Sequence, residues 1–147
     1  MSQDKYDAVI FDLLTALLNS WSLWNDVAGD ESLGWDWRKR YLQLTYQAGT
    51  YRPYEGIIRE AALDVGLAPQ AADALIGRWS ELQPWPETRE VLRALQEKVP
   101  LAVATNCSRT LAATAVAALD VRIAHVVTAE DAGYYKPHPS PYQIALN

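Results

Sequence analysis

A short apolar run near the N-terminus, followed at once by an aspartate, constrains the fold of this chain more than any other feature. The run covers residues 8–11, and Asp12 follows it. So few residues, rich in β-branched and aromatic side chains, are typical of a buried strand in a parallel sheet and too short for a helix. Because ligands of open α/β sheets bind beyond the carboxyl ends of the strands, we expect Asp12 at a ligand site. The alternative is that Asp12 only caps a helix, a position that aspartate favours.

Two later segments repeat the pattern of an apolar run that ends in polar residues. Residues 101–104 lead into Thr105 and Asn106 and precede a helical pattern, so they predict a strand, a turn and a helix N-terminus at which anions bind. Simple helix capping is the alternative for these polar residues. The apolar run 124–128 precedes Lys136, which lies in a proline-rich turn. An isolated lysine is usually a solvated surface group, but the aromatic residues and prolines around this one restrict its backbone.

Composition divides the chain into a helical insert and a flanking α/β part. Residues 20–54 hold four of the six tryptophans and four of the eight tyrosines. Apolar residues at helical spacing predict three helices after Trp24, the third of them over 70–82. After the insert, strands alternate with helices, which is typical of a parallel sheet with helical crossovers. We therefore predict an α/β fold whose parallel sheet is interrupted by helices over 16–85.

Composition and charge argue against several classes of function. The net charge of −5 and the absence of a basic cluster argue against a nucleic-acid partner. No apolar run reaches the roughly 18 residues of a membrane span, and the polar start of the chain does not resemble a secretory signal. The single cysteine, Cys107, cannot form an internal disulfide, and two histidines make a zinc site improbable. We expect a cytoplasmic protein that binds a small molecule, with a homodimer as an open alternative.

The three strand-end segments together resemble the haloacid dehalogenase (HAD) superfamily of hydrolases. Its first motif ends a strand with a nucleophilic aspartate, here Asp12 in FDLLTALL. Its second ends a strand with Ser or Thr, here Thr105 in VATNCS, and its third is a lysine before a proline, here Lys136 in YYKPHPSPY. The resemblance runs from about Tyr6 to the last residue. It implies a HAD-like, Rossmann-type parallel sheet with a helical cap over the site.

The resemblance also implies a division of the chain into two parts. Residues 1–15 and 86–147 would form the α/β core, and residues 16–85 would form the cap. The fourth motif of the superfamily, an acidic or Ser/Asp segment after a further strand, does not occur before Asn147. The resemblance therefore implies a piece of a longer enzyme, in which a further strand covers the strand at 8–11. We expect residues 1–147 alone to be inactive and to self-associate along that exposed edge.

One position separates the branches of this superfamily. Its phosphatases place a general acid two residues after the nucleophile, and here that position is Leu14, which cannot donate a proton. The 2-haloacid dehalogenases lack that acid as well, because halide leaves without protonation. Their first motif usually reads Asp-x-Tyr-Gly-Thr, and this chain departs from it with Leu14, Thr15 and Ala16.

Two other positions favour the dehalogenase branch. Its cap carries an arginine after a tryptophan at the start of a helix rich in Leu and Tyr, and Arg38 matches that position. Its third motif carries a tyrosine six residues after the lysine, which matches Tyr142. The alternatives are that Arg38 is an exposed helix charge, and that Tyr142 packs in a helix that begins at Ser140–Pro141.

The resemblance thus implies a hydrolase similar to the (S)-2-haloacid dehalogenases, which cleaves a carbon–halogen bond through an aspartyl ester. Asp12 would be the nucleophile, Lys136 would hold it ionised, and Thr105 would complete the catalytic group. Substrate contacts would come from Arg38, Asn106, Leu13, Leu14 and Tyr142. The substrate would be a 2-haloacid or a similar small anion, and neither metal nor cofactor would be needed. Two alternatives stay open: a Mg²⁺-dependent HAD phosphatase acting on a small phosphomonoester, and a non-catalytic binding protein of the same fold.

Overall fold

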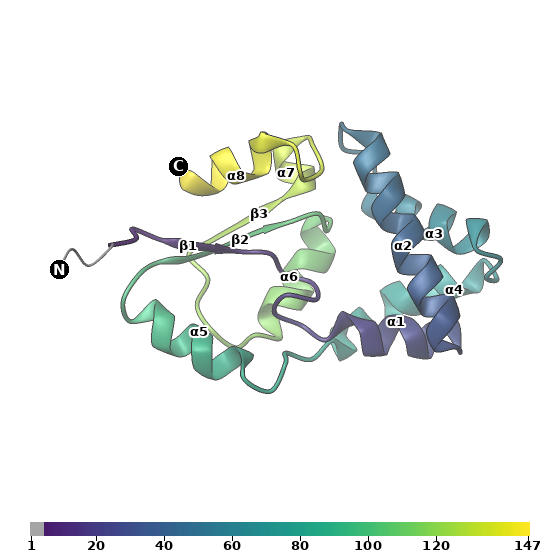
Figure 1. Ribbon diagram of the computed structural model, residues 1–147, viewed down its shortest axis with the longest axis horizontal. Helices are drawn as coiled ribbons and strands as arrows, with labels where there is room; N and C mark the ends of the chain where they lie inside the picture. The colour runs from purple at the N-terminus through teal and green to yellow at the C-terminus, as the bar shows by residue number, and fades with distance from the viewer. Residues whose placement is uncertain (1–4) are drawn as a thin grey trace.

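The computed structural model describes residues 5–147. A three-stranded parallel sheet lies between helices in one part of the molecule, beside a second group of helices (Figure 1). The strands lie side by side in chain order: β1 (Val9–Phe11), β2 (Leu101–Thr105) and β3 (His125–Thr128). Phe11 pairs with Val103, and Thr105 pairs with Thr128. These pairings confirm the predicted α/β fold with a parallel sheet. Among the described residues, β1 is an edge strand and β2 is the central one.

Helices cover both faces of this sheet. They are α5 (Thr88–Gln96), α6 (Arg109–Ala117), the short α7 (Ala129–Ala132) and α8 (Pro139–Leu146). Figure 1 shows α8 on one side of the sheet and α5 and α6 on the other. All five residues of β2 are buried, because that strand has a neighbour at each edge and helices over each face.

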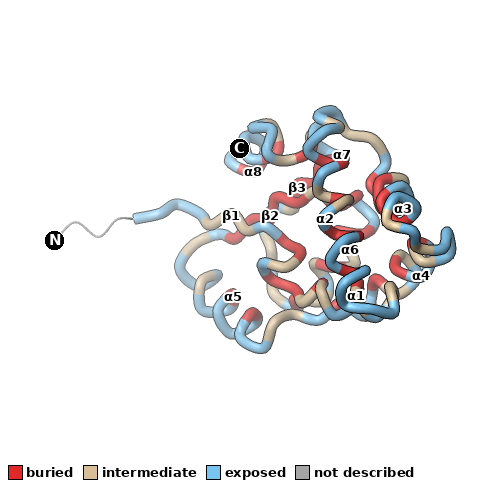
Figure 2. Tube along the Cα trace, turned by 45° about the vertical axis from the view of Figure 1, so that its right-hand side comes forward, coloured by how far each residue is buried: buried red, intermediate tan, exposed pale blue. Residues whose placement is uncertain are grey.

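The insert is a separate group of packed helices beside the sheet (Figure 1). It contains α1 (Ser20–Ala28), α2 (Glu31–Ala48), α3 (Tyr54–Asp64) and α4 (Gln70–Gly77). Aromatic side chains form its interior, where Trp24, Trp37 and Tyr54 are fully buried (Figure 2 shows the buried stretches). The rings of Trp24 and Trp37 meet edge to face at 4.7 Å between centroids. Large buried rings in edge-to-face contact stabilise such a core beyond the area that they remove from water.

Local chemistry explains both ends of α2, whereas the helix predicted to end the insert stops early. Asp30 caps α2 by accepting a hydrogen bond from the backbone N–H of Leu33, and Gly49 follows the helix with a φ of 64°. The helix predicted over 70–82 is shorter, because α4 ends at Gly77 and a 3₁₀ turn follows at Trp79–Glu81. That turn directs the indole of Trp79 toward α6, where its Nε1 donates to the carbonyl of Leu111 at 3.0 Å.

The two segments that join the insert to the sheet run side by side. The backbone N–H of Asn19 donates to the carbonyl of Gln83 at 2.8 Å, and the N–H of Trp85 donates to the carbonyl of Leu17 at 3.2 Å. A second connection lies at the far end of α2, where the N–H of Tyr51 donates to the carbonyl of Gly133 at 2.8 Å. These backbone contacts fix the insert against the carboxyl end of the sheet.

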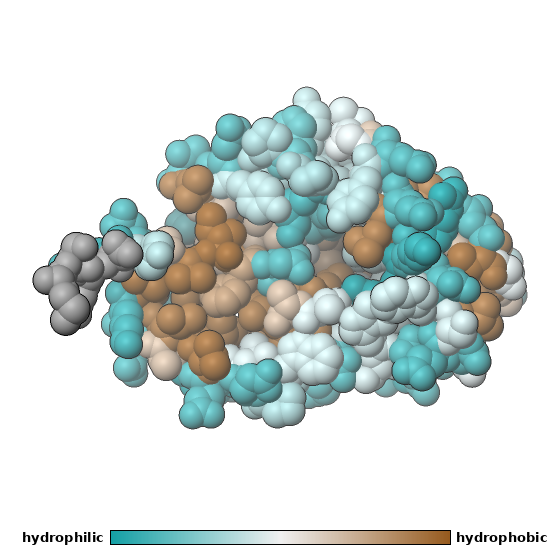
Figure 3. All heavy atoms as spheres, in the orientation of Figure 1, coloured by the Kyte–Doolittle hydropathy of each residue, from teal (hydrophilic) through white to brown (hydrophobic). Residues whose placement is uncertain are grey.

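Apolar side chains gather on the face between α5 and α8 (Figure 3). Val91 of α5 and Ile144 and Leu146 of α8 are exposed. Within residues 5–147, no helix has both the length and the apolar character needed to cross a membrane.

Candidate active site

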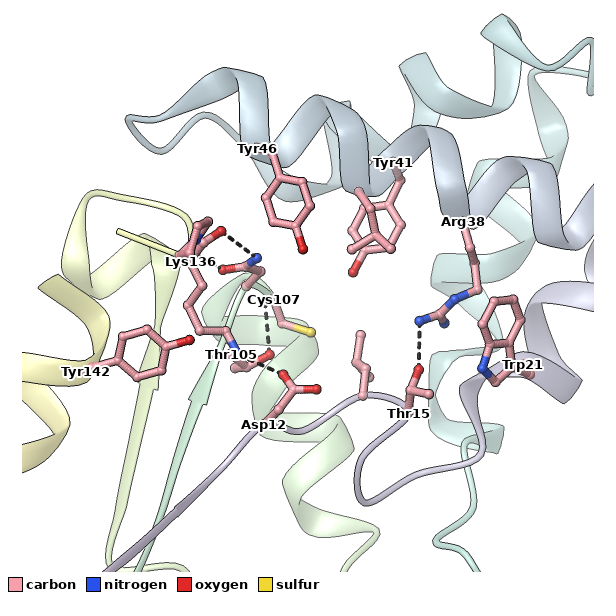
Figure 4. A pocket seen from close by; sticks show the side chains of 14 residues that line it. Asp12, Thr15, Trp21, Arg38, Tyr41, Tyr46, Thr105, Cys107, Lys136 and Tyr142 are labelled. Carbon is pink, nitrogen blue, oxygen red and sulfur yellow. Dashed lines mark hydrogen bonds and ion pairs between the residues drawn. The ribbon is translucent and has the colours of Figure 1, made fainter. Parts of the chain in front are cut away.

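A cavity of about 370 Å³ lies between the carboxyl ends of the strands and helix α2 (Figure 4). Its walls come from the turn after β1, from α1 and α2, from the turn after β2, and from the segment between α7 and the first turn of α8. The lining residues are Asp12, Leu14, Thr15, Trp21, Arg38, Tyr41, Leu42, Tyr46, Thr105, Asn106, Cys107, Lys136, Pro137 and Tyr142. Among these described residues, Asp12 is the one carboxylate. A concave site lined by aromatic residues and a few charged groups is typical of small-molecule binding.

The Asp12 carboxylate is paired with Lys136. The Lys136 Nζ donates to Asp12 Oδ1 at 2.8 Å and to the carbonyl of Ala104 at 2.7 Å. The lysine side chain is 14% exposed and the aspartate side chain 50% exposed, so the cation is fixed in the wall while the carboxylate reaches the open space. The Asn106 Oδ1 accepts from the Lys136 backbone N–H at 2.7 Å. The turn after β2 therefore positions the lysine, and the lysine positions the nucleophile candidate.

The end of β2 supplies a buried hydroxyl and a buried thiol. Thr105 is 2% exposed, and its Oγ1 accepts from the backbone N–H of Cys107 at 3.2 Å. Ser108, rather than Asn106, caps the following helix α6. Burial raises the pKa of the Cys107 thiol to about 12, so this sulfur is protonated near neutral pH. A protonated thiol is a poor nucleophile, which leaves the carboxylate of Asp12 as the nucleophile candidate.

Arg38 reaches the cavity from α2 and is 5% exposed. Its Nη1 donates to Ser20 Oγ at 2.6 Å, and its Nη2 donates to Thr15 Oγ1 at 2.7 Å. The guanidinium carbon lies 4.4 Å from the centroid of the Trp21 ring. The alternative of an exposed helix charge is therefore wrong. The buried position also means that the cation has little access to water.

Three tyrosines complete the wall of the cavity. Tyr41 is buried, and its burial raises the pKa of the phenol above its ordinary value. Tyr46 is largely exposed, and Tyr142 is partly exposed with its ring centroid 6.0 Å from Lys136 Nζ. Tyr142 lies in α8, which begins at Pro139 with His138 as its cap and not at the predicted Ser140–Pro141. Tyr142 thus lines the cavity as well as belonging to a helix.

Most of the residues predicted for the site meet in this one cavity. The residues that do so are Asp12, Leu14, Arg38, Thr105, Asn106, Lys136 and Tyr142. Leu13 does not line it, because its side chain is fully buried in the hydrophobic core. The contact predicted between the substrate and Leu13 is corrected accordingly. The side chain of Asn106 is occupied by the backbone of Lys136.

Several lining residues were not predicted individually. Thr15 was visible in the sequence only as a departure from the dehalogenase motif, and Ser20 behind it carried no signal. Trp21, Tyr41 and Tyr46 belong to the aromatic-rich insert, but composition does not reveal which rings face the cavity. In residues 5–147, no group of three or more His, Cys, Asp or Glu side chains lies close enough to hold a metal ion.

Comparison with known protein families identifies one family for this chain. The model of the family described as "haloacid dehalogenase-like hydrolase" matches residues 6–147 of this chain. No curated protein matches the sequence. Among solved structures, the L-2-haloacid dehalogenase from Xanthobacter autotrophicus superposes with a TM-score of 0.84 at 22% identity, covering 95% of this chain. The present chain spans 63% of the length of that enzyme.

Two further solved structures superpose on most of this chain. A crystal structure described as a dehalogenase superposes with a TM-score of 0.83 at 25% identity, over 98% of this chain and 71% of the other. YfnB from Bacillus subtilis, described as a HAD-hydrolase bound to magnesium, superposes with a TM-score of 0.73 at 12% identity, over 96% of this chain and 73% of the other.

Proposed function

Because this chain belongs to the haloacid dehalogenase-like hydrolases, we propose that its cavity serves the hydrolysis of a carbon–halogen bond in a small 2-haloacid. One observation carries the proposal: a lone carboxylate, Asp12, faces a buried cation, Arg38, across a cavity whose described lining holds no second acid. Leu14 occupies the position of the phosphatase acid. Halide is a leaving group that needs no proton, so a site without a general acid suits it.

In the proposed first step, a carboxylate oxygen of Asp12 attacks the carbon that bears the halogen. A carbon–oxygen bond forms while the carbon–halogen bond breaks, and the halide leaves with the bonding electron pair. Lys136 aims the carboxylate through the 2.8 Å contact with Asp12 Oδ1. Because that ammonium is also bonded to the backbone of Ala104, its position does not depend on the substrate.

In the proposed second step, water attacks the carbonyl carbon of the Asp12 ester. This releases a 2-hydroxy acid and a proton and restores the carboxylate of Asp12. The carboxylate of the substrate would be held near Thr105 and the backbone N–H of Asn106, at the end of β2 and close to the start of α6. Backbone N–H groups near a helix N-terminus favour anions. The departing halide would move toward Arg38 and the aromatic rings beside it.

Replacement of Asp12 by asparagine in the full-length protein tests the proposal. The amide keeps the shape of the side chain but is a poor nucleophile, so halide release from 2-chloropropionate should fall by at least about 1000-fold with an unchanged circular dichroism spectrum. Asp7→Asn is the matched control, because Asp7 is an exposed aspartate before β1 and outside the cavity. Mass spectrometry during turnover should detect the acid bound covalently to the wild-type chain and not to the Asp12 variant.

Three results would overturn the assignment. Substantial halide release by an Asp12→Asn variant verified to be free of deamidation would remove Asp12 as the nucleophile. Release of phosphate from a phosphomonoester, with a strict requirement for Mg²⁺ and no halide release, would move the function to phosphoryl transfer. Binding of the acid without any turnover would leave a binding protein of this fold.

A further inference from the structure

Thr15 has an unusual backbone conformation at the edge of the cavity. Its φ is 66°, in the left-handed region that β-branched residues seldom adopt. In the described part of the chain, Asp120 is the other non-glycine residue with a positive φ. The indole of Trp85 donates to the Thr15 carbonyl at 2.7 Å and holds this conformation in place. Strained residues of this kind cluster at functional sites when their surroundings fix them.

The Thr15 hydroxyl belongs to a closed ring of hydrogen bonds with Arg38 and Ser20. Each hydroxyl accepts from one guanidinium nitrogen of Arg38, at 2.7 Å for Thr15 and 2.6 Å for Ser20. The two hydroxyl oxygens are 2.9 Å apart, so one donates to the other. Ser20 is fully buried and does not line the cavity, whereas Thr15 does. If Thr15 donated to Ser20, the proton of the buried Ser20 would have no partner in this ring. With Ser20 donating to Thr15, the Thr15 proton can point into the cavity that Thr15 lines (Figure 4).

The ring also leaves the charge of Arg38 without a counter-charge. Hydroxyl groups orient a guanidinium but do not neutralise it as a carboxylate would. Among the described residues, no acid forms an ion pair with Arg38, and its buried Nε has no hydrogen-bond partner. A buried cation in this state is unfavourable unless an anion joins it. The uncompensated charge of Arg38 therefore favours binding of an anion, and the Thr15 hydroxyl lies beside it as a hydrogen-bond donor.

We propose that Thr15 is an anion-binding residue of this cavity, which holds Arg38 in place and donates a hydrogen bond from its own hydroxyl to the halide. The choice of halide as the anion rests on the proposed function. The pairing of Thr15 with Arg38 does not, because it follows from the ring of hydrogen bonds. Ser20 is a positioning residue in this scheme, because it acts through the other two and does not touch the cavity.

Bromide binding measured by calorimetry, without turnover, tests this inference. Thr15→Val keeps the branched side chain and the backbone constraint but removes the hydroxyl, and should weaken bromide binding about tenfold or more. Thr15→Ser should restore most of the affinity. Thr45→Val is the matched control, because Thr45 is a buried threonine of α2 whose hydroxyl bonds the carbonyl of Leu42, and it does not line the cavity.

A glycine variant separates backbone strain from binding. Thr15→Gly relieves the positive φ, so it should melt at a higher temperature than Thr15→Val and still bind bromide weakly. The inference is overturned if Thr15→Val is folded and binds bromide like the wild type, or if Thr45→Val loses as much affinity. Wild-type binding of acetate in preference to bromide overturns the halide assignment. If the wild type releases no halide but Thr15→Val still weakens bromide binding, the proposed function fails and this inference stands.

Discussion

In the full-length protein, replacement of Lys136 by methionine should remove activity at a modest cost in stability. Methionine retains an unbranched apolar stem but loses the ammonium, which donates to Asp12 at 2.8 Å and to the buried carbonyl of Ala104 at 2.7 Å. The ion pair contributes little, about 0–1 kcal/mol, because the Asp12 side chain is 50% exposed and is hydrated when the lysine is removed. The carbonyl of Ala104 loses a donor in a buried position, which costs about 1–3 kcal/mol.

The expected total is a loss of about 2.5 kcal/mol in the free energy of unfolding, from adding the midpoints of those two ranges. Activity should fall much further, by at least about 100-fold, because a misplaced nucleophile loses its attack geometry. Urea unfolding followed by tryptophan fluorescence gives the first quantity, and halide release gives the second. Lys98→Met is the matched control, since Lys98 is an exposed lysine outside this cavity.

The reasoning can fail in two separate ways. Turnover within tenfold of wild type would show that Lys136 does not aim the nucleophile. A loss of more than about 4 kcal/mol would show that the pair between Asp12 and Lys136 is far stronger than its exposure allows. A double-mutant cycle with Asp12→Asn then measures the pair directly, and we expect a coupling energy below about 1 kcal/mol.

Two further predictions concern metal and pH. Chelation with EDTA should leave halide release unchanged, because the proposed steps use the carboxylate of Asp12 and no metal; loss of activity that Mg²⁺ restores would contradict this. Burial raises the pKa of Cys107 to about 12, above its value in the unfolded chain, so the stability that this thiol contributes is complete below about pH 9 and is lost as the pH rises toward 12. Between pH 9 and 11, Cys107→Ala should therefore lose less free energy of unfolding than the wild type in urea titrations; equal losses would mean that the thiol is not protected.

The strand ends were predictable because their chemistry is local in the sequence. A four-residue apolar run that stops at Asp12 carries both the strand and the acid that projects from it. Thr105 follows the same rule at the end of β2. Because the carboxyl ends of parallel strands lie at the same edge of a sheet, polar residues at two strand ends predict a single site. This holds even though more than ninety residues separate Asp12 from Thr105.

The partners of Arg38 were not predictable in this way. Thr15 and Ser20 lie in the turn after β1 and at the first residue of α1, and their meeting with Arg38 depends on how α2 crosses that turn. No periodicity encodes this crossing. The shortening of α4 has a similar cause, because the reach of Trp79 to α6 is a tertiary contact that overrides local helix propensity.

The paired connections at Asn19 and Gln83 have a consequence for how this architecture varies. The backbone N–H of Asn19 donates to the carbonyl of Gln83 at 2.8 Å, so the two ends of the insert lie next to each other where they join the α/β part. A segment whose ends meet can be lengthened, shortened or exchanged while the chain on either side keeps its course. Arg38 belongs to this insert, whereas Asp12 and Lys136 belong to the α/β part. Exchange of the insert would therefore change the residues that bind the leaving group and keep the nucleophile candidate, Asp12, in place.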